Sequence, residues 1–383
     1  MAAAQVFTNI PQLDQAGVKT YSKFTIETGG NMITLGPSGT GKTEIKVQAA
    51  QEMGYDFVYL NLSVLEAPDL VGLPMIDEKE MKTKYALPAA FPRAPEDPDK
   101  GHKGRILLVD ELDKAKPELQ NPMLELFQYR SINGQSLDFH AVLATGNRPD
   151  EGAFSLPINK ALTGRCRVYQ MVPRFEPWQD WASSVGLNGL IVGFLHRNPD
   201  FFFRPDQSGD TTAYCSCSAR TWSNAARDLD YAQRGTRQND YTFQQNVVAG
   251  YVGVEAATKF QVWLEHYKEI YPMIDALVNK GTKPNLGNNT MDRIIVTAIA
   301  AGQEIARRCD GHKAGEKPSK KEVDDVHKVV KNVSEWLKEC SPDIQIAAMK
   351  STLTVDKISA FKMTDVPAFM AVFRNINQSF KNS

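Results

Sequence analysis

The sequence has few cysteines, almost no net charge and no long apolar run. Its five cysteines are odd in number and include no Cys-x-x-Cys pair, so neither a disulfide framework nor a zinc site is expected. The 44 basic and 45 acidic residues leave a formal net charge of -1, which gives no general attraction to nucleic acid. No window reaches the roughly 18 apolar residues of a membrane span. These absences predict a soluble protein of the reducing cytoplasm.

The order of strand and helix signals predicts three parts. From residue 24 to 173, short apolar runs alternate with helical patterns, which is typical of strand–helix–strand units around a parallel sheet. The five expected strands are 31–35, 56–60, 105–109, 140–145 and 167–172. Beyond residue 173 the strand signals fade. We therefore predict an α/β domain over residues 1–175, a helical lid over 176–235 and a helical C-terminal extension over 236–383.

A glycine-rich loop follows the first expected strand. Its residues Gly36, Pro37, Ser38, Gly39, Thr40, Gly41, Lys42 and Thr43 match the phosphate-loop pattern G-x-x-x-x-G-K-[S/T]. The glycines let backbone N–H groups surround a phosphate at the N-terminus of the following helix. Lys42 can bridge two phosphates, and the Thr43 hydroxyl is an oxygen ligand suited to Mg²⁺. The loop predicts a site for ATP and Mg²⁺.

Two carboxylates follow the expected strand 105–109. Asp110 and Glu111 end the apolar run Arg105-Ile-Leu-Leu-Val. A buried strand that ends here brings Asp110 to the same sheet edge as the phosphate loop, where it can hold Mg²⁺ through water. Glu111 is then the candidate general base for the water that attacks the γ-phosphate. The sequence therefore indicates hydrolysis as well as nucleotide binding.

Three more polar residues follow in order along the chain. Asn147 comes after the expected strand 140–145 and can bind the attacking water or the γ-phosphate. Arg165 lies at a helix end before the last strand and can reach the γ-phosphate of a neighbouring subunit, a role for which Arg148 and Arg167 compete. Arg220 begins a helix of the expected lid, where it can couple the bound phosphate to the lid position.

Taken in order, GPSGTGKT, ILLVDE, ATGN, TGRCR and SARTW resemble the Walker A, Walker B, sensor 1, arginine-finger and sensor 2 elements of AAA+ ATPases. The resemblance covers about residues 24–229. It implies a P-loop fold in a homo-oligomeric ring, expected to be a hexamer, that hydrolyses ATP. It also implies roles for single residues: Lys42 and Thr43 at the phosphates and metal, Asp110 at the metal, Glu111 as base, Asn147 as sensor 1, Arg165 as a finger in trans and Arg220 as sensor 2.

Further stretches are similar to MoxR-type ATPases of that class. Residues 62–103, with EAPDLVGLP and YALPAAF, resemble the insertion in their second helix, although a long surface loop is the alternative. Residues 129–137, with Asn133-Gly134, predict a hairpin before sensor 1. Residues 247–257 resemble the region after the lid in relatives that work beside a von Willebrand A domain partner. The resemblance implies a chaperone-like ATPase that remodels or activates a protein client.

Two other functions stay open. A nucleic-acid-linked ATPase of the clamp-loader or helicase-loader type is one alternative, because Gly164-Arg165-Cys166 resembles the Ser-Arg-Cys of clamp loaders. A nucleotide-dependent switch that hydrolyses ATP slowly is the other.

One helix near the C-terminus is well marked. Ser319 and Glu322 have the spacing of a capping box, and apolar residues recur after them at steps of three and four, up to Leu337. We predict a helix that packs on its own domain, because two heptads are too few for a coiled coil.

Overall fold

The computed structural model describes residues 10–89, 91, 103–148, 155–204, 214–233, 240–285, 290–309, 318–350 and 355–382. The chain forms two compact units, Met1–Arg174 and Phe175–Ser383. The five cysteines all lie in the described part of the chain, and none of them forms a disulfide. Among the described helices, none combines the length and the apolar character that crossing a membrane requires.

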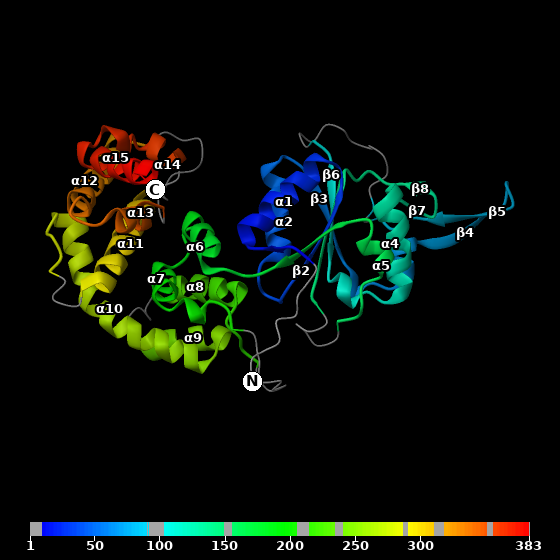
Figure 1. Ribbon diagram of the computed structural model, residues 1–383, viewed down its shortest axis with the longest axis horizontal. Coiled ribbons are helices and arrows are strands. Elements are labelled where there is room, and N and C mark those ends of the chain that lie inside the picture. The colour runs from blue at the N-terminus through cyan, green and yellow to red at the C-terminus, as the bar shows by residue number, and fades with distance from the viewer. Residues whose placement is uncertain are drawn as a thin grey trace. The chain divides into compact units, whose positions relative to one another are not determined.

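The first unit is built on a parallel sheet, seen near edge-on in Figure 1. Its strand order is β1-β10-β2-β9-β6-β3. These strands are β1 (Gln12–Leu13), β2 (Asn31–Leu35), β3 (Asp56–Asn61), β6 (Arg105–Asp110), β9 (Ala141–Gly146) and β10 (Arg167–Met171). The predicted α/β class is confirmed, and each expected strand is present to within one residue at either end. A sixth strand, the two-residue β1, adds to the edge formed by β10.

Helices cover both faces of this sheet because the strand residues alternate between two apolar cores. Met32 packs with α1 (Gln15–Glu27) and α2 (Lys42–Glu52) in one core. Its neighbour Ile33 points to the other core, which includes α4 (Pro117–Tyr129) and α5 (Lys160–Thr163). Successive side chains of a strand point to opposite faces of the sheet. Because both faces are buried here, apolar residues occupy consecutive positions, and this explains why the strands are easily recognised in the sequence.

The stretch predicted as an insertion contains regular structure. After η1 (Leu62–Val64) and α3 (Ala67–Val71), strands β4 (Leu73–Asp77) and β5 (Lys82–Ala86) pair as an antiparallel hairpin. In Figure 1 this hairpin extends away from the body of the first unit. The surface-loop alternative is therefore wrong for residues 62–86, whereas residues 90 and 92–102 lie outside the described part. The sequence did not indicate this hairpin because most of its side chains are exposed on both faces.

The hairpin predicted over 129–137 is confirmed. Strands β7 (Ser131–Ile132) and β8 (Gln135–Ser136) pair antiparallel. Asn133 and Gly134 join them with φ values of 51° and 71°, which is the left-handed conformation of a type I′ turn.

The described part of the second unit is helical except for an isolated bridge between Arg204 and Cys217. It has two apolar cores. The first core is shared by α6 (Phe175–Ser184), α7 (Gly189–Arg197), α8 (Ala219–Gln233), α9 (Tyr241–Val252) and the first part of α10 (Val254–Lys280). The second joins the end of α10 to α11 (Thr290–Cys309), α12 (Lys320–Leu337), α13 (Pro342–Lys350), α14 (Val355–Ala360) and α15 (Pro367–Asn382). The division into lid and extension at residue 235 stays a prediction, although α9 packs with the lid helices.

The well-marked helix is α12. Ser319 and Glu322 form the predicted capping box, with the Ser319 N–H donating to the Glu322 carboxylate at 2.8 Å. Val326, Val330 and Val333 are fully buried in the second core. This helix packs within its own unit, as predicted.

Candidate functional site

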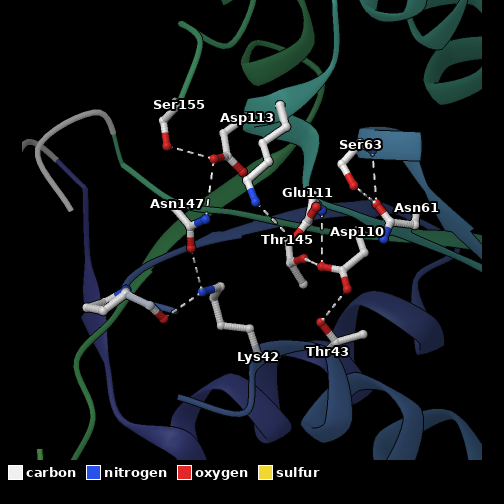
Figure 2. Close-up of polar contacts among 12 residues, drawn as sticks. Lys42, Thr43, Asn61, Ser63, Asp110, Glu111, Asp113, Thr145, Asn147 and Ser155 are labelled. Atoms are coloured by element: carbon white, nitrogen blue, oxygen red, sulfur yellow. Dashed lines mark hydrogen bonds and ion pairs between the residues drawn. The ribbon is translucent and has the colours of Figure 1, made fainter. Parts of the chain in front are cut away.

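The sheet topology brings the predicted phosphate and metal ligands to one edge. Strands β2, β9 and β6 are adjacent and parallel, so their carboxyl ends lie side by side. The phosphate loop follows β2, Asp110 and Glu111 end β6, and Asn147 follows β9. Figure 2 shows these side chains converging on one region. In open α/β sheets ligands bind at this carboxyl edge.

The loop has the conformation that a phosphate site requires. Gly39 and Gly41 have φ values of 75° and 92°, which side chains rarely tolerate. Helix α2 begins within the motif, at Lys42, and the first N–H groups of a helix have no acceptor within the helix. The Lys42 ammonium is nearly buried and donates to the carbonyls of Gly36 at 2.6 Å and Pro37 at 2.7 Å. The Lys42 ammonium is thus held at the phosphate loop, at the N-terminus of α2.

The Asp110 carboxylate is held by hydrogen bonds at both oxygens. Its Oδ2 accepts from the Thr43 hydroxyl at 3.0 Å and the Tyr59 hydroxyl at 2.8 Å. Its Oδ1 accepts from the Thr145 hydroxyl and from the Glu111 N–H. Burial raises the pKa of Asp110, but these four hydrogen bonds together outweigh it and lower the pKa below its ordinary value. Asp110 is therefore ionised at neutral pH.

The donor set fits Mg²⁺. The Thr43 hydroxyl and the Asp110 carboxylate offer adjacent hard oxygen atoms, which Mg²⁺ prefers, and Mg²⁺ takes its other ligands from water and phosphate. Across the described ranges, no group of three or more His, Cys, Asp and Glu could hold a metal ion.

Glu111 has an unusual backbone. Its φ of 55° and ψ of 43° lie in the left-handed region, which is uncommon for a residue other than glycine. This conformation ends β6 and begins the short turn η2 (Leu112–Lys114). The Glu111 carboxylate accepts from the Lys114 ammonium at 3.2 Å. Strained residues of this kind concentrate at functional sites.

Asn147 lies between the phosphate loop and a second carboxylate. Its Oδ1 accepts from the Lys42 ammonium at 3.1 Å, and its Nδ2 donates to Asp113 Oδ2 at 3.4 Å. Asp113 is fully buried, and its Oδ2 also accepts from the Ser155 hydroxyl at 2.8 Å. Sequence reasoning missed Asp113, Tyr59 and Thr145. The run Asp-Glu-Leu-Asp was the available signal for Asp113, because a tight turn after Asp110 returns the second aspartate to the site.

Lys46 was also missed. It lies on α2, is fully buried, and its ammonium donates to the Thr34 hydroxyl at 2.5 Å. Burial lowers the pKa of Lys46 to about 7, with a further lowering by the charge of Lys42 that Asp110 partly opposes. The Lys46 ammonium, on the helix that follows the phosphate loop, thus loses its charge near neutral pH.

Arg165 lies at the amino-terminal ends of the parallel strands, opposite to the ends that carry the phosphate loop. Its carbonyl accepts from Asn31 Nδ2 at 3.0 Å, and Asn31 is the first residue of β2. The loop begins five residues later at Gly36, about 16 Å away at roughly 3.3 Å per strand residue. The guanidinium is exposed and donates to Gln128 at 2.8 Å and to the Ala161 carbonyl at 2.7 Å. Arg165 cannot reach the phosphate loop of its own chain.

The other candidate arginines are Arg167, Arg148 and Arg220, and each lies in a different place. Arg167 begins β10 near Arg165, with its guanidinium 5.0 Å from the centre of the Phe24 ring. Arg148 follows Asn147 and is half-buried, at the edge that carries the phosphate loop. Arg220 is exposed on α8 in the second unit.

The fold and this edge define a P-loop nucleotide-binding domain. Residues 32–174 match the model of the "ATPase family associated with various cellular activities (AAA)". This part of the chain is therefore similar to an AAA domain.

Single relatives are more distant. A stretch of 125 residues is 28% identical to the ClpA homolog protein of Fuscovulum blasticum, covering 30% of this chain and 14% of that protein. Among solved structures, a RuvB mutant from Thermotoga maritima has 12% identity and a TM-score of 0.36 over 72% of this chain and 80% of its own. A candidate ATPase from Cytophaga hutchinsonii has 14% identity and a TM-score of 0.29 over 94% of this chain and 88% of its own. TM-scores this low carry no argument about function.

Proposed function

We propose that this chain is an ATPase that works as a homo-oligomeric ring and remodels or activates a protein client. The observation that carries the proposal is the convergence of Lys42, Thr43, Asp110, Glu111 and Asn147 at the carboxyl edge of the sheet (Figure 2). The match of residues 32–174 to the AAA family model supports the same activity.

Each residue of the site has a distinct part in hydrolysis. The phosphate loop binds the phosphates of ATP through its N–H groups and through Lys42. Thr43 and Asp110 would hold Mg²⁺, which would supply positive charge to the phosphates. Glu111 accepts a proton from the attacking water, and its bond to Lys114 keeps the carboxylate at the end of β6 until then. Asn147 orients that water.

Arg165 acts on the nucleotide of a neighbouring subunit in this proposal. Its location at the amino end of the sheet supports an action in trans, since the phosphate loop of its own chain is at the other end. Arg167 begins the strand beside it and stays the alternative finger, whereas Arg148 lies at the edge that holds its own nucleotide site. Arg220 is proposed as sensor 2, a residue of the lid over 176–235.

The finer assignment is a MoxR-type, chaperone-like ATPase of the cytoplasm, with a von Willebrand A domain protein as a candidate partner. The β4–β5 hairpin supports it, because Met75, Ile76 and Met81 expose 59%, 76% and 82% of their surface on an element that extends from the body. Exposed apolar side chains on a projecting element are suited to contact with another protein.

The test of the activity compares turnover and ATP affinity in variants of the full chain. Glu111→Gln should keep the affinity for ATP and lose at least about 100-fold in turnover, since it removes the proton acceptor. Lys42→Ala should weaken ATP binding itself. Glu118→Gln, the same change at an exposed residue of α4, is the matched control. Equal turnover in the parent and in Glu111→Gln would remove Glu111 as the base, and low turnover in both would favour the slow switch.

The test of the ring mixes two inactive variants. Arg165→Ala protein retains an intact phosphate loop, and Lys42→Ala protein retains an intact finger. If the site is shared, a mixture should recover part of the activity that neither variant has alone. A mixture as inactive as its components, or a parent that stays monomeric with ATP in size-exclusion chromatography, contradicts action in trans.

A further inference from the structure

Asn147 is held between two groups of opposite hydrogen-bonding character. The Lys42 ammonium has only donors and faces Asn147 Oδ1 at 3.1 Å, whereas the Asp113 carboxylate has only acceptors and faces Asn147 Nδ2 at 3.4 Å. Turning the amide by 180° would bring its oxygen against a carboxylate and its NH₂ group against an ammonium. Both contacts would then be repulsive, so the chemistry of the two neighbours fixes one orientation of the amide.

Asp113 is an unusual neighbour because it is an acidic side chain in the interior of the first unit. Its side chain is fully buried, no cation is paired with it among the described ion pairs, and its Oδ1 has no hydrogen-bond donor in the described part of the chain. The other oxygen accepts from Asn147 and from Ser155. A buried carboxylate without a counter-ion destabilises the fold. Packing alone therefore does not explain why an aspartate occupies position 113.

We propose that Asp113 is a positioning residue that makes Asn147 present its oxygen, and not its NH₂ group, to the nucleotide site. When a phosphate takes the Lys42 ammonium, Asn147 Oδ1 loses its donor and becomes free to accept a hydrogen bond. The proton donor left at that place is the attacking water. Asn147 then orients this water as an acceptor, and its NH₂ group stays on Asp113 and does not contact the γ-phosphate.

This inference rests on the proposed hydrolysis, and a charge-swapped pair tests it in the full chain. Asp113→Asn offers both a donor and an acceptor, so it removes the preference for one amide orientation. Asn147→Asp keeps the acceptor but sets two carboxylates against each other. In the double variant, Asn147→Asp with Asp113→Asn, the new amide donates to the new carboxylate, which still faces the site with an oxygen.

Turnover at saturating ATP should be highest in the variants in which the side chain at position 147 presents an oxygen atom to the nucleotide site. We expect a loss of about 10-fold for Asp113→Asn and about 100-fold for Asn147→Asp, since small misplacements of a reacting group have effects of this size. The double variant should recover at least about tenfold over Asn147→Asp. Affinity for a fluorescent ATP analogue should change less than about threefold in Asp113→Asn, and turnover is expressed per molecule that binds the analogue, so unfolded protein does not count.

Two references separate this inference from the proposed function. Asp138→Asn, the same change at a partly exposed aspartate paired with Arg105, should turn over like the parent. Turnover in the parent above that in Glu111→Gln shows that the site hydrolyses ATP. Given that, a double variant as slow as Asn147→Asp would mean that the NH₂ group is the working part of Asn147, and it would overturn the inference. A parent without turnover would sink the proposed function and this inference with it.

Discussion

Replacing Lys46 by methionine should stabilise the first unit, and more at low pH than at high pH. Lys46 is fully buried on α2, and its one described hydrogen bond goes to the Thr34 hydroxyl. Burial lowers its pKa to about 7 from an ordinary value of 10.5, Lys42 acts in the same direction, and Asp110 opposes both. Methionine has a similar length and no charge to bury.

The pKa difference sets the magnitude. At about 1.36 kcal/mol per pKa unit, the lowering corresponds to roughly 5 kcal/mol by which the protonated side chain destabilises the fold below pH 7. Between pH 7 and pH 10.5 the unfolded chain holds the Lys46 proton and the folded chain has lost it. The parent's free energy of unfolding therefore rises with pH over this window. The advantage of Lys46→Met should fall by about 2 kcal/mol from pH 7 to pH 9. The lost bond to Thr34 subtracts about 1 kcal/mol at both values.

The assay must follow the first unit by itself. The five tryptophans all lie in the second unit, at Trp178, Trp181, Trp222, Trp263 and Trp336. Their fluorescence in urea therefore reports the second unit. Unfolding of the first unit is measured by brief proteolysis across a urea series at pH 7 and pH 9, with cleavage products identified by mass spectrometry.

The decisive quantity is the change in the stability difference between Lys46→Met and the parent from pH 7 to pH 9. Lys82→Met, at an exposed lysine of β5, is the control and should show no such pH dependence. A stability difference between Lys46→Met and the parent that is the same at pH 7 and pH 9, to within about 0.5 kcal/mol, would contradict the titration of Lys46. A burial penalty without titration would give that result.

Two further predictions concern single hydrogen bonds. Tyr59→Phe removes one donor from Asp110, so the Mg²⁺ concentration for half-maximal ATPase activity should rise roughly 2- to 5-fold, with little change in maximal turnover; an unchanged Mg²⁺ requirement would show that Tyr59 does not hold the carboxylate. Ser319→Ala removes the cap of α12 and should lower the free energy of unfolding of the second unit by about 1 kcal/mol, measured in urea by fluorescence that includes Trp336; Ser319→Asp, which can still cap, should lose less.

Local patterns in the sequence determined the parts of the first unit. The central strands β2, β6 and β9 are buried on both faces, so each is a continuous apolar run that can be recognised without knowledge of its neighbours. The phosphate loop is a local motif, because its backbone conformation requires glycines at set positions and its site requires Lys42 directly after the last glycine. The turn at Asn133-Gly134 and the cap at Ser319 are equally local. Such features depend on residues a few positions apart, and these are visible in a sequence.

The relations among those parts were decided by tertiary structure. The sequence predicts Arg165 as a finger in trans but cannot state its distance from the phosphate loop of its own chain, whereas the parallel strands place it at their amino-terminal ends, opposite to that loop. Lys46 looks like a solvated helix residue until α2 packs on β2 and buries it. Asp113 acquires its meaning when the ends of β6 and β9 meet, because that contact brings it to Asn147 from 34 positions away. Strand pairing and burial depend on the whole chain, so a pattern of residue types cannot state which charge ends up inside or which side chain another one faces.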